Sequence, residues 1–128
     1  MTERALPNRR LLTRQKVKIG GHNIYFDVGF YDEEKTEIGE VWIVVEQTGA
    51  EMRALMDDGA RLSSKLIQYG CSVEEVALGW LGVKGRPCGP VQGDARIKNA
   101  TSIRDYIARH LLITYYQRDD LAHVKEVK

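Results

Sequence analysis

The sequence predicts an α+β domain in which a three-stranded antiparallel sheet is followed by three helices, with one long helix packed on the sheet. Two observations support this fold class. Three segments with strand patterns occupy residues 14–46, and three segments with helical periodicity come after them. The longest helical segment, residues 50–69, carries an apolar stripe at helical spacing, which we expect to face the sheet.

The three strand segments are joined by short links, which favours an antiparallel meander. Residues 14–19 alternate in polarity, and Gly20-Gly21 then predicts a two-residue hairpin turn, because such turns need positive φ. Residues 22–31 form the returning strand, in which one face is fully apolar and the other is mixed. Residues 41–46 are apolar on both faces except at their end, which is typical of a central or doubly covered strand. The faces of the second strand are Ile24, Phe26, Val28 and Phe30 against Tyr25, Asp27, Gly29 and Tyr31.

The long helix is expected to span residues 50–69, with Thr48 as its N-cap and Gly70 just after its end. Thr48 and Glu51 have the spacing of a capping box, and Gly70 stands where a left-handed residue closes a helix. Small residues beside the stripe let a neighbouring backbone come close. We therefore expect this face to pack flat on the sheet, and a leucine at Gly59 to destabilise the fold. The stripe consists of Met52, Leu55, Met56, Leu62, Leu66 and Ile67, with Gly59, Ala60 and Ser63 in or beside it.

Two shorter helices are expected in the last third of the domain. Ser72 and Glu75 repeat the capping-box spacing. A third helix is expected to begin near Asn99 to Ser102, with Asp105 three residues after Ser102. The glycine- and proline-containing residues 83–98 between them are expected to form an irregular loop. The chain divides into an N-terminal arm (1–13), a single domain (14–114) and a charged C-terminal tail (115–128).

The composition is that of one soluble globular domain, with 128 residues, 43% apolar and 29% charged. Nineteen basic and eighteen acidic residues give a net charge of +1, so no overall field favours nucleic acid or an anionic membrane. The first dozen residues lack the apolar core of a signal peptide, and no apolar run approaches the ~20 residues of a spanning helix. Two cysteines without a secretory signal indicate a reducing compartment, so we expect a cytoplasmic protein.

The sequence does not predict a metal or cofactor site. The cysteines do not form a C-x-x-C pair, and His22, His110 and His123 lie in a hairpin, a helix and the tail. The chain also lacks the glycine patterns of phosphate and dinucleotide loops. We therefore expect neither metal nor cofactor.

Two groups of cations are candidates for binding an anion or a partner. Arg9 and Arg10 belong to the basic arm, and Lys84, Arg86 and Cys88 belong to the Gly/Pro loop, whose backbone N–H groups are available to an anion. A neighbouring cation such as Arg86 also favours the thiolate form of Cys88. The alternatives are a solvated arm, a plain connection and an ordinary loop cysteine.

An apolar patch is expected on the less covered face of the sheet, formed by Tyr25, Tyr31, Trp42 and Val44. Such a patch often marks an interface. We expect it to bind a second copy in a homodimer, since two-fold symmetry is the commonest arrangement of identical subunits, or a protein partner. The competing expectation is that the arm or the third helix folds over this face.

A series of short stretches resembles one known domain. They are Leu6-Pro7-x-Arg9-Arg10, Thr13 to Lys18, Ile19-Gly20-Gly21-His22, Val28-Gly29-x-Tyr31, Gly49 with Leu55-Met56-Asp57, Gln68-Tyr69-Gly70, and Thr101 to Ile107. In this order they are similar to the TSCPD domain, found near the C-terminus of adenosylcobalamin-dependent (class II) ribonucleotide reductases and in some free-standing proteins. The resemblance covers roughly Leu6 to Leu112. The chain lacks the Thr-Ser-Cys-Pro-Asp signature that names the family, and its nearest local analogue, Arg86-Pro87-Cys88-Gly89-Pro90, is not that motif. It also lacks the closely spaced cysteines that follow the domain in the large reductases.

The resemblance implies an accessory domain rather than reductase activity, because 128 residues have no room for the catalytic barrel. We therefore expect a non-catalytic module that binds itself or a partner such as a reductase. The alternative is a small nucleotide- or nucleic-acid-binding regulator that uses the arm and the Gly/Pro loop. A thiol enzyme built on Cys88 is a third reading, for which the sequence positions no base.

Overall fold

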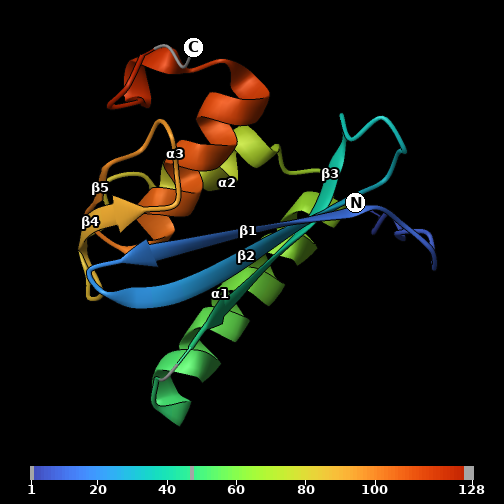
Figure 1. Cartoon of the computed structure of the whole chain (residues 1–128). Helices are drawn as coiled ribbons and strands as arrows, with labels where there is room; N and C mark the ends of the chain where they lie inside the picture. Colours follow the sequence, from blue (N-terminus) through green and yellow to red (C-terminus); the bar gives the residue numbers. More distant parts are fainter. Residues whose placement is uncertain (1, 47, 126–128) are drawn as a thin grey trace.

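A five-stranded antiparallel sheet and three helices make up the fold (Figure 1). The computed structural model describes residues 2–46 and 48–125. The sheet order is β3-β2-β1-β4-β5, so the predicted meander forms one side of the sheet. The elements are β1 (Leu12–Ile19), β2 (His22–Phe30), β3 (Ile38–Val45), α1 (Ala50–Gln68), α2 (Val73–Trp80), β4 (Gly89–Gln92), β5 (Asn99–Ala100), α3 (Ile103–Tyr116) and a 3₁₀ turn η1 (Asp119–Leu121).

The α+β class is confirmed, but the prediction of three strands is wrong. The two additional strands, β4 and β5, lie in or next to the segment that was expected to be an irregular loop. They are four and two residues long, too short to show an alternating pattern. β4 pairs with the end of β1, where Lys18 faces Gln92 and Ile19 faces Val91.

The β1–β2 hairpin has the predicted two-residue turn. Ile19 faces His22, and Gly20 and Gly21 between them have φ of +54° and +87°. Gly20 is also a close-approach position, since a Cβ atom there would lie 2.3 Å from the backbone oxygen of Cys88. The turn is therefore packed against the chain that leads into β4.

Helix α1 lies along β3, which is an edge strand, and shields its backbone. The Ser64 hydroxyl donates to Val41 O and accepts from Val41 N, both at 3.0 Å. The Gln68 side-chain amide donates to Gly39 O at 3.1 Å. These contacts satisfy groups that an exposed edge would offer to another strand.

The predicted inward stripe of α1 is wrong in part. The residues buried toward β3 are mostly small, namely Ala60, Ser63, Ser64 and Ile67. Leu55, Leu62 and Leu66 are exposed, and Gly59 has open space around it rather than a packed seam. The helix begins after Gly49 without a side-chain cap, so the predicted cap at Thr48 is wrong too. The reason is geometric: α1 approaches the edge of β3 closely, and only small side chains fit there.

Helix α3 covers the inner face of the sheet. Tyr106 and His110 pack edge-on against Phe26, with ring centroids 5.8 and 4.9 Å away, and Tyr115 packs on Phe30. The predicted caps of α2 and α3 are present: Ser72 accepts from Glu75 N, and Ser102 accepts from Asp105 N. The core therefore lies between α3 and the inner face of β1 and β2.

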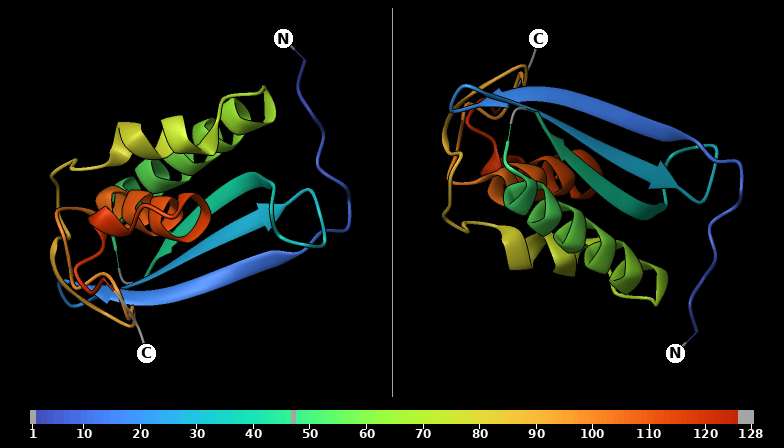
Figure 2. Two further views of the ribbon diagram at one scale, coloured as in Figure 1. Left: turned by 90° about the horizontal axis from the view of Figure 1, so that it is seen from above. Right: turned by 90° about the horizontal axis from the view of Figure 1, so that it is seen from below.

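Both ends of the described chain return to the domain. At the N-terminal end, Arg4 N donates to Gln68 O at 2.8 Å, which ties the predicted arm to the end of α1. At the C-terminal end, His123 N and Val124 N both donate to Arg96 O, and Ala122 is buried. Neither end covers the outer side of β1 and β2, which is open in the view from below (Figure 2, right).

Candidate functional site

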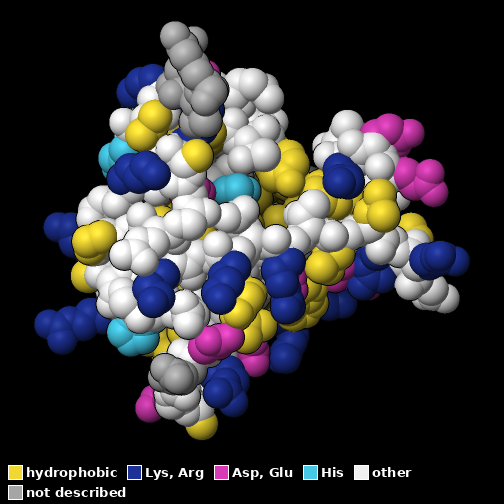
Figure 3. All heavy atoms as spheres, viewed as in Figure 1, with side chains coloured by type: hydrophobic (Ala, Val, Ile, Leu, Met, Phe, Trp, Pro, Cys, Tyr) yellow, Lys and Arg dark blue, Asp and Glu magenta, His cyan; other side chains and the backbone are white. Residues whose placement is uncertain are grey.

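Alternate residues of β1, β2 and β3 form the outer face of the sheet, the side turned away from α3. The strand register places Lys16, Tyr25 and Val44 in one row. Figure 3 shows Lys and Arg side chains gathered in the region of β1. The outer face, as we use the term, consists of Leu12, Arg14, Lys16, Lys18, Tyr25, Asp27, Glu40, Trp42 and Val44.

Asp27 and Arg14 form an ion pair on this face. Arg14 Nε donates to Asp27 Oδ1 at 2.7 Å, and its Nη2 donates to Oδ2 at 2.9 Å. The Asp27 side chain is only 11% exposed, while Arg14 remains 55% exposed. Such bidentate arginine–carboxylate pairs have a fixed geometry, and their hydrogen bonds are stronger than hydrogen bonds between neutral groups. The carboxylate is thus neutralised within the sheet, and its cation faces solvent.

Glu40 forms a second ion pair, with Arg10 of the arm. Its carboxylate accepts hydrogen bonds from Arg10 in the arm and from Trp42 Nε1, the latter at 2.8 Å. Burial raises the pKa of Glu40, but the hydrogen bonds from Arg10 and Trp42 outweigh it and hold the pKa below its usual value. Gly29 makes room for this carboxylate, because a Cβ atom there would lie 2.2 Å from Glu40 Oε2. This network anchors both the arm and the Trp42 ring.

The four predicted interface residues do not all lie together. Tyr25, Trp42 and Val44 share the outer face, where Val44 is 45% exposed and Leu12 adds a further exposed apolar side chain. Tyr31 lies apart, because the arm covers it: its hydroxyl donates to Arg4 O at 2.8 Å, and the Arg4 guanidinium lies 3.9 Å from its ring centroid. The sheet face thus carries a smaller apolar patch than expected.

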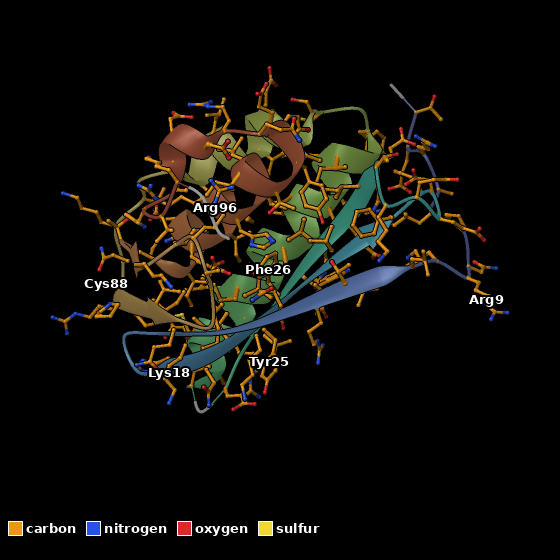
Figure 4. The ribbon with its side chains drawn as sticks, turned by 45° about the horizontal axis from the view of Figure 1, so that its top comes forward. Arg9, Lys18, Tyr25, Phe26, Cys88 and Arg96 are labelled. Carbon is orange, nitrogen blue, oxygen red and sulfur yellow. The ribbon has the colours of Figure 1, made fainter. Side chains whose placement is uncertain are left out.

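The predicted anion-binding residues fall into two separate places. Figure 4 shows Arg9 and Cys88 at opposite ends of the molecule. Lys84, Arg86 and Cys88 line a shallow cavity of about 380 Å³ together with Asn99 and Thr101. Arg10 is instead part of the Glu40 network, and Arg9 is exposed on the arm. The structure therefore does not bring the two groups of cations together.

A largely buried polar cluster that the sequence did not reveal joins the β4–β5 loop to α3. Asp94 accepts hydrogen bonds from the Tyr106 hydroxyl at 2.8 Å and from Arg96 N and Ile97 N at 2.8 and 2.9 Å. His110 Nδ1 lies 3.6 Å from Asp94 Oδ2, beside a cavity of about 310 Å³. Burial raises the pKa of Asp94, but the contact with His110 and the hydrogen bonds from Arg96 N, Ile97 N and Tyr106 outweigh it and hold the pKa well below its usual range. The carboxylate is engaged on both oxygens, so the cluster fastens the loop to α3.

The described residues offer no metal site. Within residues 2–46 and 48–125, no three His, Cys, Asp or Glu side chains lie close enough together to hold a metal ion. In the same part of the chain, no helix is both long and apolar enough to cross a membrane.

With this geometry in view, comparison with known proteins gives a clear family assignment. The model of the TSCPD domain matches residues 2–115. The chain belongs to the TSCPD domain family. It is similar to vitamin B12-dependent ribonucleotide reductases of Agrobacterium fabrum (44% identical over 119 residues), Bradyrhizobium diazoefficiens (40% over 119 residues) and Rhodopirellula baltica (33% over 116 residues). No solved structure matches the chain significantly.

The match covers most of this chain but only a small part of each relative. It spans 93% of this chain for the Agrobacterium and Bradyrhizobium proteins and 90% for the Rhodopirellula protein. In the relatives it spans only 9%, 9% and 11% of the length. The chain therefore corresponds to a small part of these reductases.

A stretch that shares three of its five residues with the family's signature builds the start of α3. Thr101, Ser102 and Asp105 match the first, second and fifth residues of Thr-Ser-Cys-Pro-Asp, while Ile103 and Arg104 replace cysteine and proline. Asp105, 1% exposed, accepts from Thr101 N at 3.1 Å and from Gly82 N at 2.7 Å. Here Ser102 caps α3, and Asp105 ties the first turn of α3 to the end of α2.

Proposed function

We propose that this TSCPD domain is a non-catalytic binding module whose outer face docks a protein partner of the ribonucleotide-reductase type. The observation that carries the proposal is the outer face itself. It presents Tyr25, Trp42 and Val44 on the side of the sheet that faces away from α3, next to charges that are already paired. A flat face of this composition suits a polypeptide surface with its own polar rim.

The size of the relatives supports a reductase-type partner. In proteins such as the Agrobacterium reductase, the matching region is about a tenth of the chain, so it is joined to a much larger polypeptide. In these relatives the domain and the rest of the reductase are thus parts of one polypeptide. Association between the two is therefore the natural role to test first.

The groups of the outer face support binding rather than chemistry. Asp27 and Glu40 each lie in a hydrogen-bonded ion pair with an arginine, which fixes the carboxylates in place. A general acid or base needs a proton-transfer group within reach of a substrate, and both carboxylates are largely shielded from solvent. Their role in the proposal is to hold Arg14 and Trp42 in position for a partner.

The test is a binding measurement with a purified vitamin B12-dependent ribonucleotide reductase from the organism that encodes this chain. Titration calorimetry with the wild-type chain should show saturable binding. The variant Val44→Lys should weaken binding at least tenfold, because it puts an unpaired charge in the centre of the patch. Leu78→Lys is a matched control, since Leu78 is similarly exposed but lies on α2. Absence of binding by the wild-type chain would refute the proposal.

A nucleotide or nucleic-acid ligand is the alternative, and one observation favours it. Lys16 and Lys18 extend along β1 beside Tyr25, and cations next to an aromatic ring suit a phosphate and a stacked base. The same titration with ATP and with a single-stranded oligonucleotide tests it. Binding that falls steeply with salt and is lost in Lys16→Glu would favour this alternative over a reductase-type partner.

A further inference from the structure

Helix α1 has a second apolar face, which lies on the side turned away from β3. Its residues follow one another at alternating steps of three and four along the helix. This spacing has an average period of 3.5 residues, which is the pattern of a helix that packs against another helix. The α1 seam, as we call this face, consists of Met52, Leu55, Gly59, Leu62, Leu66 and Tyr69.

The α1 seam is open to solvent in the single chain. Leu55, Leu62 and Leu66 are 60%, 64% and 53% exposed, and Tyr69 is 41% exposed. Seen from below, α1 runs along the outside of the molecule with no other element in front of it (Figure 2, right). Large apolar side chains that are contiguous and exposed commonly mark an interaction site.

The seam has protruding leucine side chains, which we call knobs, and one cavity that can receive such a side chain, which we call the hole. A cavity of about 190 Å³ lies between α1 and α2 and is lined by Leu55, Met56, Gly59 and Trp80, with Ile43 and Arg104. Gly59 opens this cavity, because a Cβ atom at that position would have no neighbour within 4 Å. An apolar side chain from another helix therefore has a place to enter.

We propose that the α1 seam binds the α1 seam of a second copy of this chain, with the two helices antiparallel. In this register the knob and the hole are complementary, since Leu62 of each copy faces Gly59 and the adjoining cavity of the other. Leu55 then faces Leu66, and Met52 faces Tyr69. Every seam residue thus finds a partner under one two-fold axis, the closed symmetry that identical subunits adopt most often.

The charges beside the seam fit the same register. Asp58 and Lys65 flank it on one side, and in the antiparallel pair Asp58 of each copy comes next to Lys65 of the other, as in flanking salt bridges of coiled coils. Both side chains are exposed, at 64% and 54%. Within one chain Asp58 reaches Arg61 only at 3.7 Å, and Lys65 contacts Glu3. A parallel pair would place neither charge opposite the other.

The helix is already formed before the copies meet. A seam of this length spans only about 26 Å, and an isolated helix so short would be marginal in water. Here α1 is held by β3, so association does not have to pay for folding the helix. The outer face of the sheet plays no part in this contact, and either proposal can fail while the other stands.

The first experiment is light scattering on the full chain over a concentration series up to the millimolar range. The wild-type chain should reach a mass twice that of one 14.5 kDa chain. Leu62→Lys should return the mass to one chain, because it puts a charge into the hole of the other copy. The matched control Leu78→Lys replaces an exposed leucine of α2, outside the seam, and should leave the dimer intact.

The hole gives a second test that does not depend on a destabilising change. Gly59→Gln fills the hole with a good helix former, so the variant should become monomeric while its melting temperature in the dilute, monomeric state does not fall. Gly79→Gln makes the same replacement at a glycine of α2 that also has open space, and it should remain dimeric.

Charge exchange tests the antiparallel register. Asp58→Lys and Lys65→Asp should each raise the dimer dissociation constant several-fold, and the double variant should restore it. A wild-type chain that remains monomeric, a mass above two chains, or a dimer that survives both Leu62→Lys and Gly59→Gln would overturn the proposal. Failure of the double variant to recover affinity would overturn it as well.

Discussion

Ser64 of α1 binds both backbone groups of Val41 on β3, donating to the carbonyl oxygen and accepting from the N–H at 3.0 Å each. One buried hydroxyl thus replaces the neighbouring strand that an edge strand lacks. Ala60 and Ser63 make the approach possible, because they are small and face the same side of the helix. The edge of the sheet is closed by a helix, and this leaves the opposite side of α1 free.

The first prediction concerns this contact. Ser64→Ala should lower the free energy of unfolding by about 1–3 kcal/mol, because it leaves a buried N–H and a buried carbonyl without a partner. Ser63→Ala is the control, since in the described part of the chain the Ser63 hydroxyl makes no hydrogen bond to β3. Urea unfolding of both variants measures the difference. Equal effects would mean that the hydroxyl of Ser64 does not support the edge.

The position of α1 also shows what a sequence pattern can and cannot give. Helical periodicity predicted α1 nearly to the residue, from Ala50 to the end at Gln68. It also selected the large leucines as the buried face, because apolar residues usually define the inside. α1 has two apolar sides, however, and the close approach to β3 is made by the small one. Only the packing of the edge strand decides between them.

The hairpin turn and the caps of α2 and α3 were predictable because they depend on local interactions, whereas the packing of α1 depends on distant ones. The Gly20-Gly21 turn and the caps at Ser72 and Ser102 depend on residues within a few positions of each other, so the sequence contains the whole interaction. The alternation of β2 likewise separated Tyr25 from Phe26 correctly. The Asp94 cluster depends on residues 12 and 16 positions apart that fold into contact, and no local pattern announces it.

The second prediction concerns the hairpin turn. Gly20→Ala should be more destabilising than Gly21→Ala, although both residues have positive φ. Each change carries a backbone cost of about 1–2 kcal/mol. At Gly20 the new Cβ atom also meets Cys88 O, so a further cost of roughly 1–3 kcal/mol is expected, whereas at Gly21 it meets nothing within 4 Å. Thermal unfolding of the two variants gives the comparison, and similar melting temperatures would contradict it.

The third prediction concerns the family signature. Asp105→Asn should cost about 1–3 kcal/mol, since Asp105 accepts from Thr101 N and Gly82 N with different oxygens. An asparagine keeps only one acceptor oxygen, so its NH₂ group would face a backbone donor in a buried place. Glu75→Gln makes the equivalent change at the same position of α2, where the side chain is exposed, and should stay within about 0.5 kcal/mol. The signature would not serve to cap α3 if both variants were equally stable.

The last prediction is a pH dependence that arises from Asp94. Burial raises its pKa, but the contact with His110 and the hydrogen bonds from Arg96 N, Ile97 N and Tyr106 hold the pKa in the folded state below the value of about 3.9 expected in the unfolded chain. A group with a depressed pKa contributes stability that is full above its unfolded pKa and is lost as the pH falls toward the folded value. The urea midpoint of the wild-type chain should therefore drop as the pH is lowered from about 5 to 3. Asp94→Asn keeps the shape of the side chain without its titration, so its midpoint should be lower at neutral pH and should change less over this interval. Glu34→Gln, in the exposed turn after β2, is the control and should follow the wild-type curve. An unchanged acid slope in Asp94→Asn would show that other carboxylates govern the acid stability of the fold.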